Sequence, residues 1–210
     1  MSYTIQKERK TRLITVLNEI GALKFGTFKL TSGKTSAYYI DLRVVPSFPE
    51  AFQIVCDCYL DVVTNDVGVD RFDRLSGIPT AGIPFASVIA YQLRKPLLYV
   101  RPGVRSHGRG RRIEGVLMPG DRVLLIDDLI TTGGSLLTSA NVIRTDGGVV
   151  RDAVVLLDRS EGGKESLAKN NIALHYLLNV KEIALQLYEL GSITREQFKI
   201  IVDQAHDRGT

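Results

Sequence analysis

The sequence predicts an α/β fold in which a central, mostly parallel β-sheet is flanked by helices. Short apolar runs rich in branched side chains alternate along the chain with longer segments whose apolar residues recur at helical spacing. Several of the short runs end in aspartate or glycine, which is typical of buried strands that lead into ligand-binding loops. A length of 210 residues allows one such domain with a small appendage and is too short for two large domains.

The expected elements follow one another in a simple order. A helix over 5–23, whose pattern Gly21 ends, precedes a hairpin over 25–34 and 37–42 that would form a small hood. Core strands are predicted over 72–78, 96–100, 123–126, 154–157 and 172–178, and core helices over 48–63, 83–93 and 136–144. Terminal helices are predicted over 180–188 and 194–205, the second opened by a capping box of Thr194 and Gln197. We therefore expect a single domain with a hood over about 1–45, a core over about 46–180 and C-terminal helices over 180–206.

The apolar runs and the cysteines indicate where the protein works. No apolar run approaches the length of a membrane span, and Met1 to Arg12 are polar and charged, without a signal-peptide core. We therefore expect a cytoplasmic protein with no membrane partner. Cys56 and Cys58 lie two residues apart in an apolar stretch that looks helical, so they point in different directions and are expected to be buried thiols.

The net charge of +4 raises the question of nucleic acid binding, so its distribution matters. Residues 101–112 hold five arginines and no acid, and removing these five from the 27 basic residues leaves 22 against 23 acidic residues. The basic charge therefore belongs to one loop and not to a surface. The glycines of this loop disfavour a stable helix and its charge disfavours burial, so we expect a lid that orders when an anion binds. A solvated loop and an RGG-like nucleic-acid tract are the two alternatives.

The most informative stretch runs from Arg122 to Ser135. Val123 to Ile126 suits a strand buried on both faces, and Asp127 and Asp128 follow it directly. The sequence Thr-Thr-Gly-Gly-Ser at 131–135 then offers hydroxyls and a flexible backbone whose N–H groups can converge on a phosphate at the start of a helix. A single ligand with both hydroxyls and a phosphate would fit this arrangement. An acidic pair alone could equally solvate a loop and cap the helix. Neither a Walker loop nor a dinucleotide fingerprint is present.

The whole pattern of strand, acidic pair, Thr-Thr-Gly-Gly-Ser loop and helix closely resembles the phosphoribosyl-pyrophosphate (PRPP) signature of the type I phosphoribosyltransferases. The stretch from Phe28 to Arg43 (Phe-x-Leu-x-Ser-Gly-Lys-x-Ser-x-Tyr-Tyr-Ile-Asp-x-Arg) is similar to the N-terminal part of orotate phosphoribosyltransferases. The turn over 77–82 matches the family's pyrophosphate loop, and Arg-x-x-x-Arg-x-His-Gly from Arg101 matches its catalytic loop. These motifs occur in the family's order over residues 25–163.

The resemblance implies transfer of a phosphoribosyl group from PRPP to orotate, with Mg²⁺ on the pyrophosphate and ribose oxygens and no metal ligand directly from the protein. The implied catalytic residues are Arg105, His107, Asp127 and Asp128. PRPP binding is implied for these four and for Arg101, Leu129, Ile130, Thr131, Thr132, Gly133, Gly134 and Ser135, and orotate binding for Thr131 and Arg159. Family enzymes are dimers in which the lid reaches the neighbouring site, so Arg105 and His107 are expected to act across a homodimer.

Several positions depart from the better-known bacterial pattern. Pro102, Arg105, Ala81 and Thr31 each stand where a lysine is usual, so anion binding here is expected to depend more on arginine. Arg159 has a plainer interpretation as a salt-bridge partner of Asp158 or Glu161. The rival functions are transfer to another base, and a regulator that senses PRPP while binding nucleic acid. The hood motif and Arg159 argue against the first, and the intact lid together with the lack of a helix-turn-helix extension against the second.

Overall fold

A six-stranded sheet forms the centre of the computed structural model, which describes residues 3–29, 35–103 and 112–207. The strand order is β5-β4-β3-β6-β7-β8, and all neighbours are parallel except the antiparallel edge pair β4 and β5. The strands are β3 (Arg74–Gly77), β4 (Leu97–Val100), β5 (Ile113–Glu114), β6 (Val123–Ile130), β7 (Asp152–Asp158) and β8 (Ala173–Asn179). The predicted α/β class with a mostly parallel sheet is confirmed.

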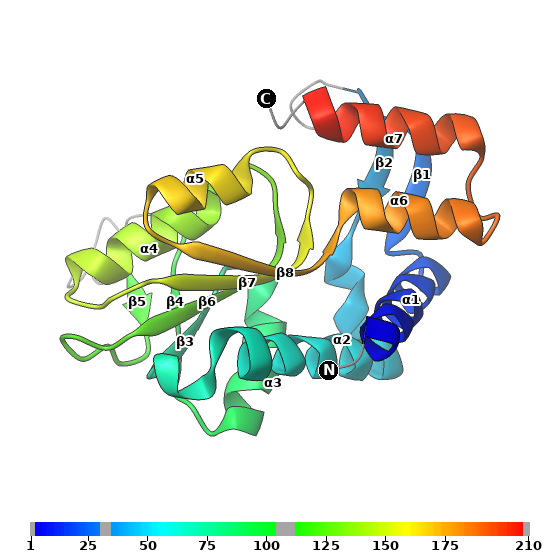
Figure 1. Ribbon diagram of the computed structural model, residues 1–210. Helices are drawn as coiled ribbons and strands as arrows, with labels where there is room; N and C mark the ends of the chain where they lie inside the picture. The colour runs from blue at the N-terminus through cyan, green and yellow to red at the C-terminus, as the bar shows by residue number, and fades with distance from the viewer. Residues whose placement is uncertain (1–2, 30–34, 104–111, 208–210) are drawn as a thin grey trace.

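Helices cover both faces of this sheet (Figure 1). One face packs on α2 (Pro49–Val62) and α3 (Gly82–Leu93), and the other on α4 (Gly134–Thr145) and α5 (Gly163–Lys169). Side chains of β6 alternate between the two resulting cores, because Leu124 and Ile126 belong to the first and Val123 and Leu125 to the second. A continuous apolar run is therefore what a strand buried on both faces requires.

The hood is built from segments far apart in the sequence. β1 (Leu23–Lys29) and β2 (Thr35–Ile40) form an antiparallel pair, and α1 (Tyr3–Glu19), α6 (Val180–Glu189) and α7 (Arg195–Asp207) lie beside it (Figure 1). The N–H of Ala37 donates to Gln204 Oε1 at 3.1 Å, and Lys10 Nζ lies 2.7 Å from Glu182 Oε1. The C-terminal helices thus complete the N-terminal hairpin.

Several predicted boundaries were wrong, and neighbouring elements explain why. β6 runs four residues beyond the predicted end at 126, because β7 continues to pair with it up to Ile130. β2 begins and ends two residues early, since Leu42 starts a 3₁₀ helix, Leu42–Ser47. α5 and the two-residue β5 were not predicted, because both are too short to show a periodic pattern. A π-helical turn (Val63–Val67) and a 3₁₀ turn (Val69–Arg71) also join α2 to β3.

The capping box and the burial of Cys56 were predicted correctly, whereas Cys58 was predicted to be buried and is only half-buried. Thr194 and Gln197 form the reciprocal capping box, with N–H···O distances of 2.8 and 3.2 Å. Cys56 is buried and Cys58 half-buried, and burial raises the pKa of the Cys56 thiol to about 12 and that of Cys58 to about 11. Both thiols are therefore protonated at neutral pH.

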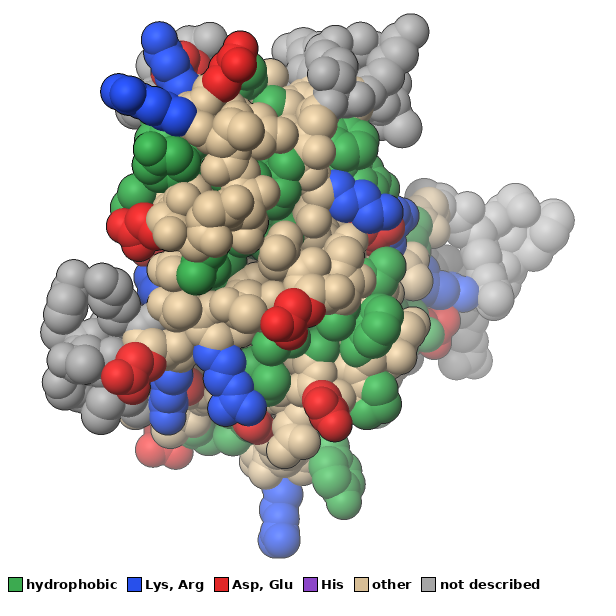
Figure 2. All heavy atoms as spheres, turned by 90° about the vertical axis from the view of Figure 1, so that its right-hand side faces the viewer, with side chains coloured by type: hydrophobic (Ala, Val, Ile, Leu, Met, Phe, Trp, Pro, Cys, Tyr) green, Lys and Arg blue, Asp and Glu red, His purple; other side chains and the backbone are tan. Residues whose placement is uncertain are grey.

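The surface of the hood end is mixed in charge. Basic, acidic and hydrophobic side chains are interspersed over the coloured part of the face in Figure 2. In the part of the chain that the structure describes, no helix is long and apolar enough to cross a membrane.

Candidate functional site

The acidic pair lies in the part of β6 that pairs with β7 but no longer with β3. β3 ends opposite Ile126, at Gly77, whereas β7 continues beside Asp127 and beyond. Asp127 is 7% exposed and Asp128 is half-buried. Both aspartates therefore belong to the last part of β6. The early end of β3 leaves space beside them.

That space is a pocket of about 280 Å³ at the carboxyl ends of the strands, where open α/β sheets bind ligands. It brings the acidic pair together with the loop that follows and with the turn after β3. The residues lining it are Ile78, Pro79, Thr80, Ala81, Asp127, Asp128, Leu129, Ile130, Thr131, Thr132, Gly133, Gly134, Ser135 and Leu136. All nine residues expected at 127–135 thus meet in one place.

The loop between β6 and α4 has the geometry of an anion site. Gly133 precedes the helix with φ of +85°, a left-handed conformation that other residues rarely adopt. It turns the chain so that the first N–H groups of α4, which have no partner within the helix, lie beside the pocket that Gly134 and Ser135 line. Both of these residues are exposed, and a Cβ on Gly134 would meet nothing within 4 Å.

The turn after β3 approaches β6 so closely that only glycine fits at its end. A Cβ on Gly82 would lie 2.5 Å from the Ile126 carbonyl oxygen and 3.0 Å from Asp127 Oδ1. The N-terminus of α3 therefore packs directly against the acidic strand. Ala81, which stands at the position of a family lysine, lines the pocket.

Burial makes the acidic pair difficult to ionise. Desolvation, and after it the charge of Asp128, raises the pKa of Asp127 well above its usual value. Desolvation also raises the pKa of Asp128, although its hydrogen bond with Asp127 and the charge of Arg43 act in the opposite direction. A cationic group beside the pair would restore both charges, so the site favours a ligand that carries or develops positive charge.

Arg43 was part of the hood motif, but no role was predicted for it. Its Nε and Nη2 donate to the two carboxylate oxygens of Asp41 at 2.7 and 2.9 Å, and Nη2 also donates to the Tyr39 hydroxyl at 3.0 Å. The charge of Arg43 lowers the pKa of Asp128, against the larger effect of burial. Arg43 is therefore near enough to the acidic pair to influence it electrostatically.

Tyr59 makes a hydrogen bond to the backbone of the acidic strand. This fully buried residue of α2 donates its hydroxyl proton to the Asp127 carbonyl oxygen at 2.5 Å, and its ring stacks on Phe85. Burial raises the pKa of Tyr59 well above its usual value, so the phenol remains a donor. One weak signal for this role could have been found in the sequence, because a hydroxyl-bearing side chain stands among the buried positions of an apolar helix.

Removing this hydroxyl should loosen the acidic strand. We expect Tyr59→Phe to lower the free energy of unfolding by about 1–3 kcal/mol, because the Asp127 carbonyl loses a buried donor. Denaturant unfolding measures the change, and Tyr91→Phe is the matched control, since Tyr91 is 84% exposed. Equal stability of the two variants would show that the hydrogen bond contributes nothing.

Arg159 lies at the end of β7, next to the acidic strand. The backbone N–H of Arg159 donates to the Ile130 carbonyl oxygen at 3.1 Å. Its guanidinium carbon lies 5.1 Å from the centre of the Tyr38 ring of the hood. The side chain is 13% exposed, and its Nη2 lies 2.9 Å from Glu161 Oε1. The salt bridge to Glu161 that the sequence allowed is thus present.

Two nitrogens of the Arg159 guanidinium nevertheless lack a hydrogen-bond partner among the described residues. Nε and Nη2 of Arg159 are buried, and neither makes a hydrogen bond within the described part of the chain, so the Glu161 contact is electrostatic without a directed N–H···O bond. These two nitrogens form the edge that holds a carboxylate in this same protein: Nε and Nη2 of Arg122 bind the two oxygens of Asp73 at 2.9 and 2.7 Å. Nε and Nη2 of Arg159 therefore carry N–H groups whose hydrogen bonds are unmade among the described residues, although Glu161 lies beside Nη2, and this edge has the geometry that binds a carboxylate.

The lid lies largely outside the described residues, and Arg105 and His107 are among the positions not described. Its base is defined, because Tyr99 pairs with Glu114 and Val100 with Ile113. Arg101 Nε lies 3.0 Å from Glu114 Oε1 at this base. The base of the lid is therefore an antiparallel strand pair at the sheet edge.

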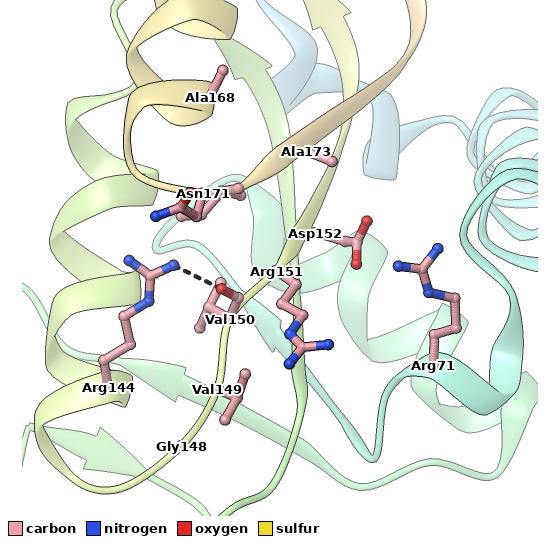
Figure 3. Close-up of a pocket in the computed structure, with 11 residues that line it drawn as sticks. Arg71, Arg144, Gly148, Val149, Val150, Arg151, Asp152, Ala168, Asn171 and Ala173 are labelled. Carbon is pink, nitrogen blue, oxygen red and sulfur yellow. Dashed lines mark hydrogen bonds between the residues drawn. The ribbon is translucent and has the colours of Figure 1, made fainter.

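A larger hollow of about 620 Å³ lies at the opposite edge of the sheet, where β7 and β8 begin (Figure 3). Three arginines surround it, but Arg144 Nη2 donates to the carbonyl oxygens of Val150 and Asn170 at 2.7 and 3.0 Å. Asp152, the acid in its lining, lies 3.0 Å from His175 Nε2. The C-terminal ends of α4 and α5 add partial negative charge. The pocket at the acidic pair, and not this hollow, has the features of a reaction site.

Comparison with known proteins agrees with this geometry. The family model described as "Phosphoribosyl transferase domain" matches residues 69–183 and so defines the class. The chain is 45% identical to an orotate phosphoribosyltransferase of Cenarchaeum symbiosum over 84% of its length and 88% of that protein. It is 41% identical to one from Pyrobaculum aerophilum, over 91% and 96%. The crystal structure of orotate phosphoribosyltransferase from Aeropyrum pernix superposes with a TM-score of 0.76 at 37% identity, covering 87% of this chain and 99% of that one. The chain belongs to the orotate phosphoribosyltransferase family.

Proposed function

We propose that this protein transfers the phosphoribosyl group of PRPP to orotate, which yields orotidine 5′-monophosphate and pyrophosphate in pyrimidine biosynthesis. The observation that carries the choice of base is that Nε and Nη2 of Arg159 are buried and make no hydrogen bond within the described residues. Orotate carries a carboxylate, whereas adenine, hypoxanthine and uracil do not. A buried guanidinium fork beside the acidic strand is a site for that carboxylate, with Thr131 in the adjoining loop as a second partner.

The acidic pair fits the chemistry of the ribose. Departure of pyrophosphate leaves oxocarbenium-like positive charge on the sugar ring, and Asp127 and Asp128 would stabilise this charge while accepting hydrogen bonds from the ribose hydroxyls. Burial raises the pKa of both carboxyl groups, and positive charge on the bound sugar would favour their ionised forms. The backbone and hydroxyls of residues 131–135 would hold the 5′-phosphate at the start of α4.

Mg²⁺ fits this site as a companion of the substrate. Within the described residues, no three His, Cys, Asp or Glu side chains come together as a metal-binding group. The ion would be held through pyrophosphate and ribose oxygens and by water, which suits its reluctance to lose its water ligands. It would offset the negative charge of the leaving pyrophosphate.

Arginines of the lid would take up the rest of that charge. Arg101 stands at the base of the lid, and Arg105 and His107 are proposed to reach the pyrophosphate of the neighbouring subunit in a homodimer. The family resemblance supports this role. Cytoplasmic location is proposed on the same basis.

The carboxylate assignment is tested with Arg159→Ala. We expect the KM for orotate to rise by the equivalent of about 2–5 kcal/mol, since the variant lacks a charge-assisted pair to the substrate carboxylate, while the KM for PRPP changes little. Steady-state kinetics with each substrate varied in turn gives both values, and adenine, hypoxanthine and uracil are assayed beside orotate. Arg151→Ala is the matched control, because Arg151 is exposed at the opposite edge of the sheet. Equal increases in both KM values would mean that Arg159 is structural.

A further inference from the structure

Glu161 forms an ion pair with Arg159. Its Oε1 lies 2.9 Å from Arg159 Nη2, and the side chains of the two residues are 14% and 13% exposed. Largely buried opposite charges at this separation attract each other more strongly than a surface pair would. Glu161 therefore neutralises Arg159 when no ligand is bound.

The backbone holds Glu161 in this position. Ser160 has φ of +55° and Gly162 has φ of +85°, so the residues on both sides of Glu161 have left-handed backbone conformations before α5 begins. The Ser160 N–H donates to Asp158 Oδ1 at 2.8 Å, which fixes the first of these conformations at the end of β7. The local backbone structure thus places the Glu161 side chain beside Arg159.

The contact is nevertheless incomplete as a salt bridge. Nη2 lies within ion-pair distance of Glu161 but makes no aligned hydrogen bond with it, and Nε has no hydrogen-bond partner among the described residues. The bidentate pair of Arg122 and Asp73 shows what a satisfied fork looks like in this protein. Glu161 therefore balances the charge of Arg159 without satisfying the hydrogen-bonding capacity of Nε and Nη2.

We propose that the charge of Glu161 opposes binding of the substrate carboxylate at Arg159 and so sets how tightly the site binds orotate. This inference rests on the proposed function. When the carboxylate of orotate takes the Nε and Nη2 edge, two negative groups share one guanidinium, and their repulsion weakens binding. The same repulsion favours release of the product nucleotide, which keeps the carboxylate. An uncharged base gains no such penalty, so Glu161 acts only on ligands that carry the carboxylate.

The test is Glu161→Gln, which removes the charge and keeps the size of the side chain. We expect the Kd of orotate, measured by titration calorimetry, to fall about three- to tenfold, somewhat more than an exposed ion pair would give. The Kd of PRPP should stay unchanged. Orotamide, in which a neutral amide replaces the carboxylate, should bind equally to wild type and variant. Glu165→Gln is the matched control, because Glu165 is an exposed residue of α5.

The outcomes separate the inference from the proposed function. Weaker or unchanged orotate binding by E161Q overturns the inference, since Glu161 would then orient Arg159 or be indifferent to the ligand. Wild type that binds no orotate overturns the proposed function and with it the inference. If E161Q is unstable, Glu161→Asp draws the carboxylate back from Nη2 by one methylene, and tighter orotate binding is again the supporting result.

Discussion

The double substitution Asp127→Asn with Asp128→Asn is expected to abolish turnover while the protein stays folded. Both charges face the pocket, and neither makes an ion pair within the described residues, so their loss should lower kcat by about a thousandfold or more through the transition state alone. Orotate turnover, followed by the loss of its absorbance, measures the effect, and circular dichroism confirms folding. Near-normal activity in a folded double variant would contradict the role of the pair.

The same carboxylates should destabilise the empty protein, which gives a second readout. Because burial raises the pKa of Asp127, the folded state holds its proton more tightly than the unfolded state, and unfolding free energy is lost as the pH rises above the usual carboxyl value of about 4. We therefore expect Asp127→Asn to raise the free energy of unfolding by roughly 0.5–2 kcal/mol at neutral pH and by little below pH 4. Thermal unfolding across this pH range tests the sign.

The second large effect concerns the lid. A protein with Arg105→Ala and His107→Ala should be inactive, as should the double variant of the acidic pair, for complementary reasons. If the lid of each subunit serves its neighbour, subunit exchange between the two proteins creates heterodimers with one wholly wild-type site. We expect activity to return to about a quarter of wild type after random exchange, by the symmetry of a two-fold dimer.

Differential tags on the two proteins show how many heterodimers form, so that activity can be expressed per heterodimer. In the control, the lid variant is taken through the same exchange with itself, and it should stay inactive. Heterodimers without activity would mean that the lid closes over its own subunit's site or takes no part in catalysis.

The sequence was informative where neighbouring residues carry the chemistry. The acidic pair and the loop over 131–135 form one continuous strand, turn and helix, so their place at the sheet edge could be predicted. The length of β6 could not, because it depends on where β3 and β7 stop. Strand pairing across the sheet is invisible to local periodicity.

Residues that act from a distance were also missed. Tyr59 reaches the carbonyl oxygen of Asp127 from another helix, 68 positions earlier in the chain. Arg43 was noticed as part of a motif, but its influence on Asp128 depends on how the hood folds over the core. For Arg159 the sequence offered two interpretations, a ligand-binding fork and a salt bridge to Glu161. The structure shows the ion pair with Glu161 and also shows that Nε and Nη2 of Arg159 make no hydrogen bond among the described residues.

The hood has a consequence for how the protein forms during synthesis. The Ala37 N–H and Gln204 Oε1 are 167 positions apart, and Lys10 and Glu182 are 172 apart. Contacts of such long sequence separation form slowly and cannot form until the ribosome has released the later partner. Most of the parallel sheet can assemble earlier. The ring of Tyr38, which lies over the guanidinium of Arg159, is therefore secured among the last parts of the protein.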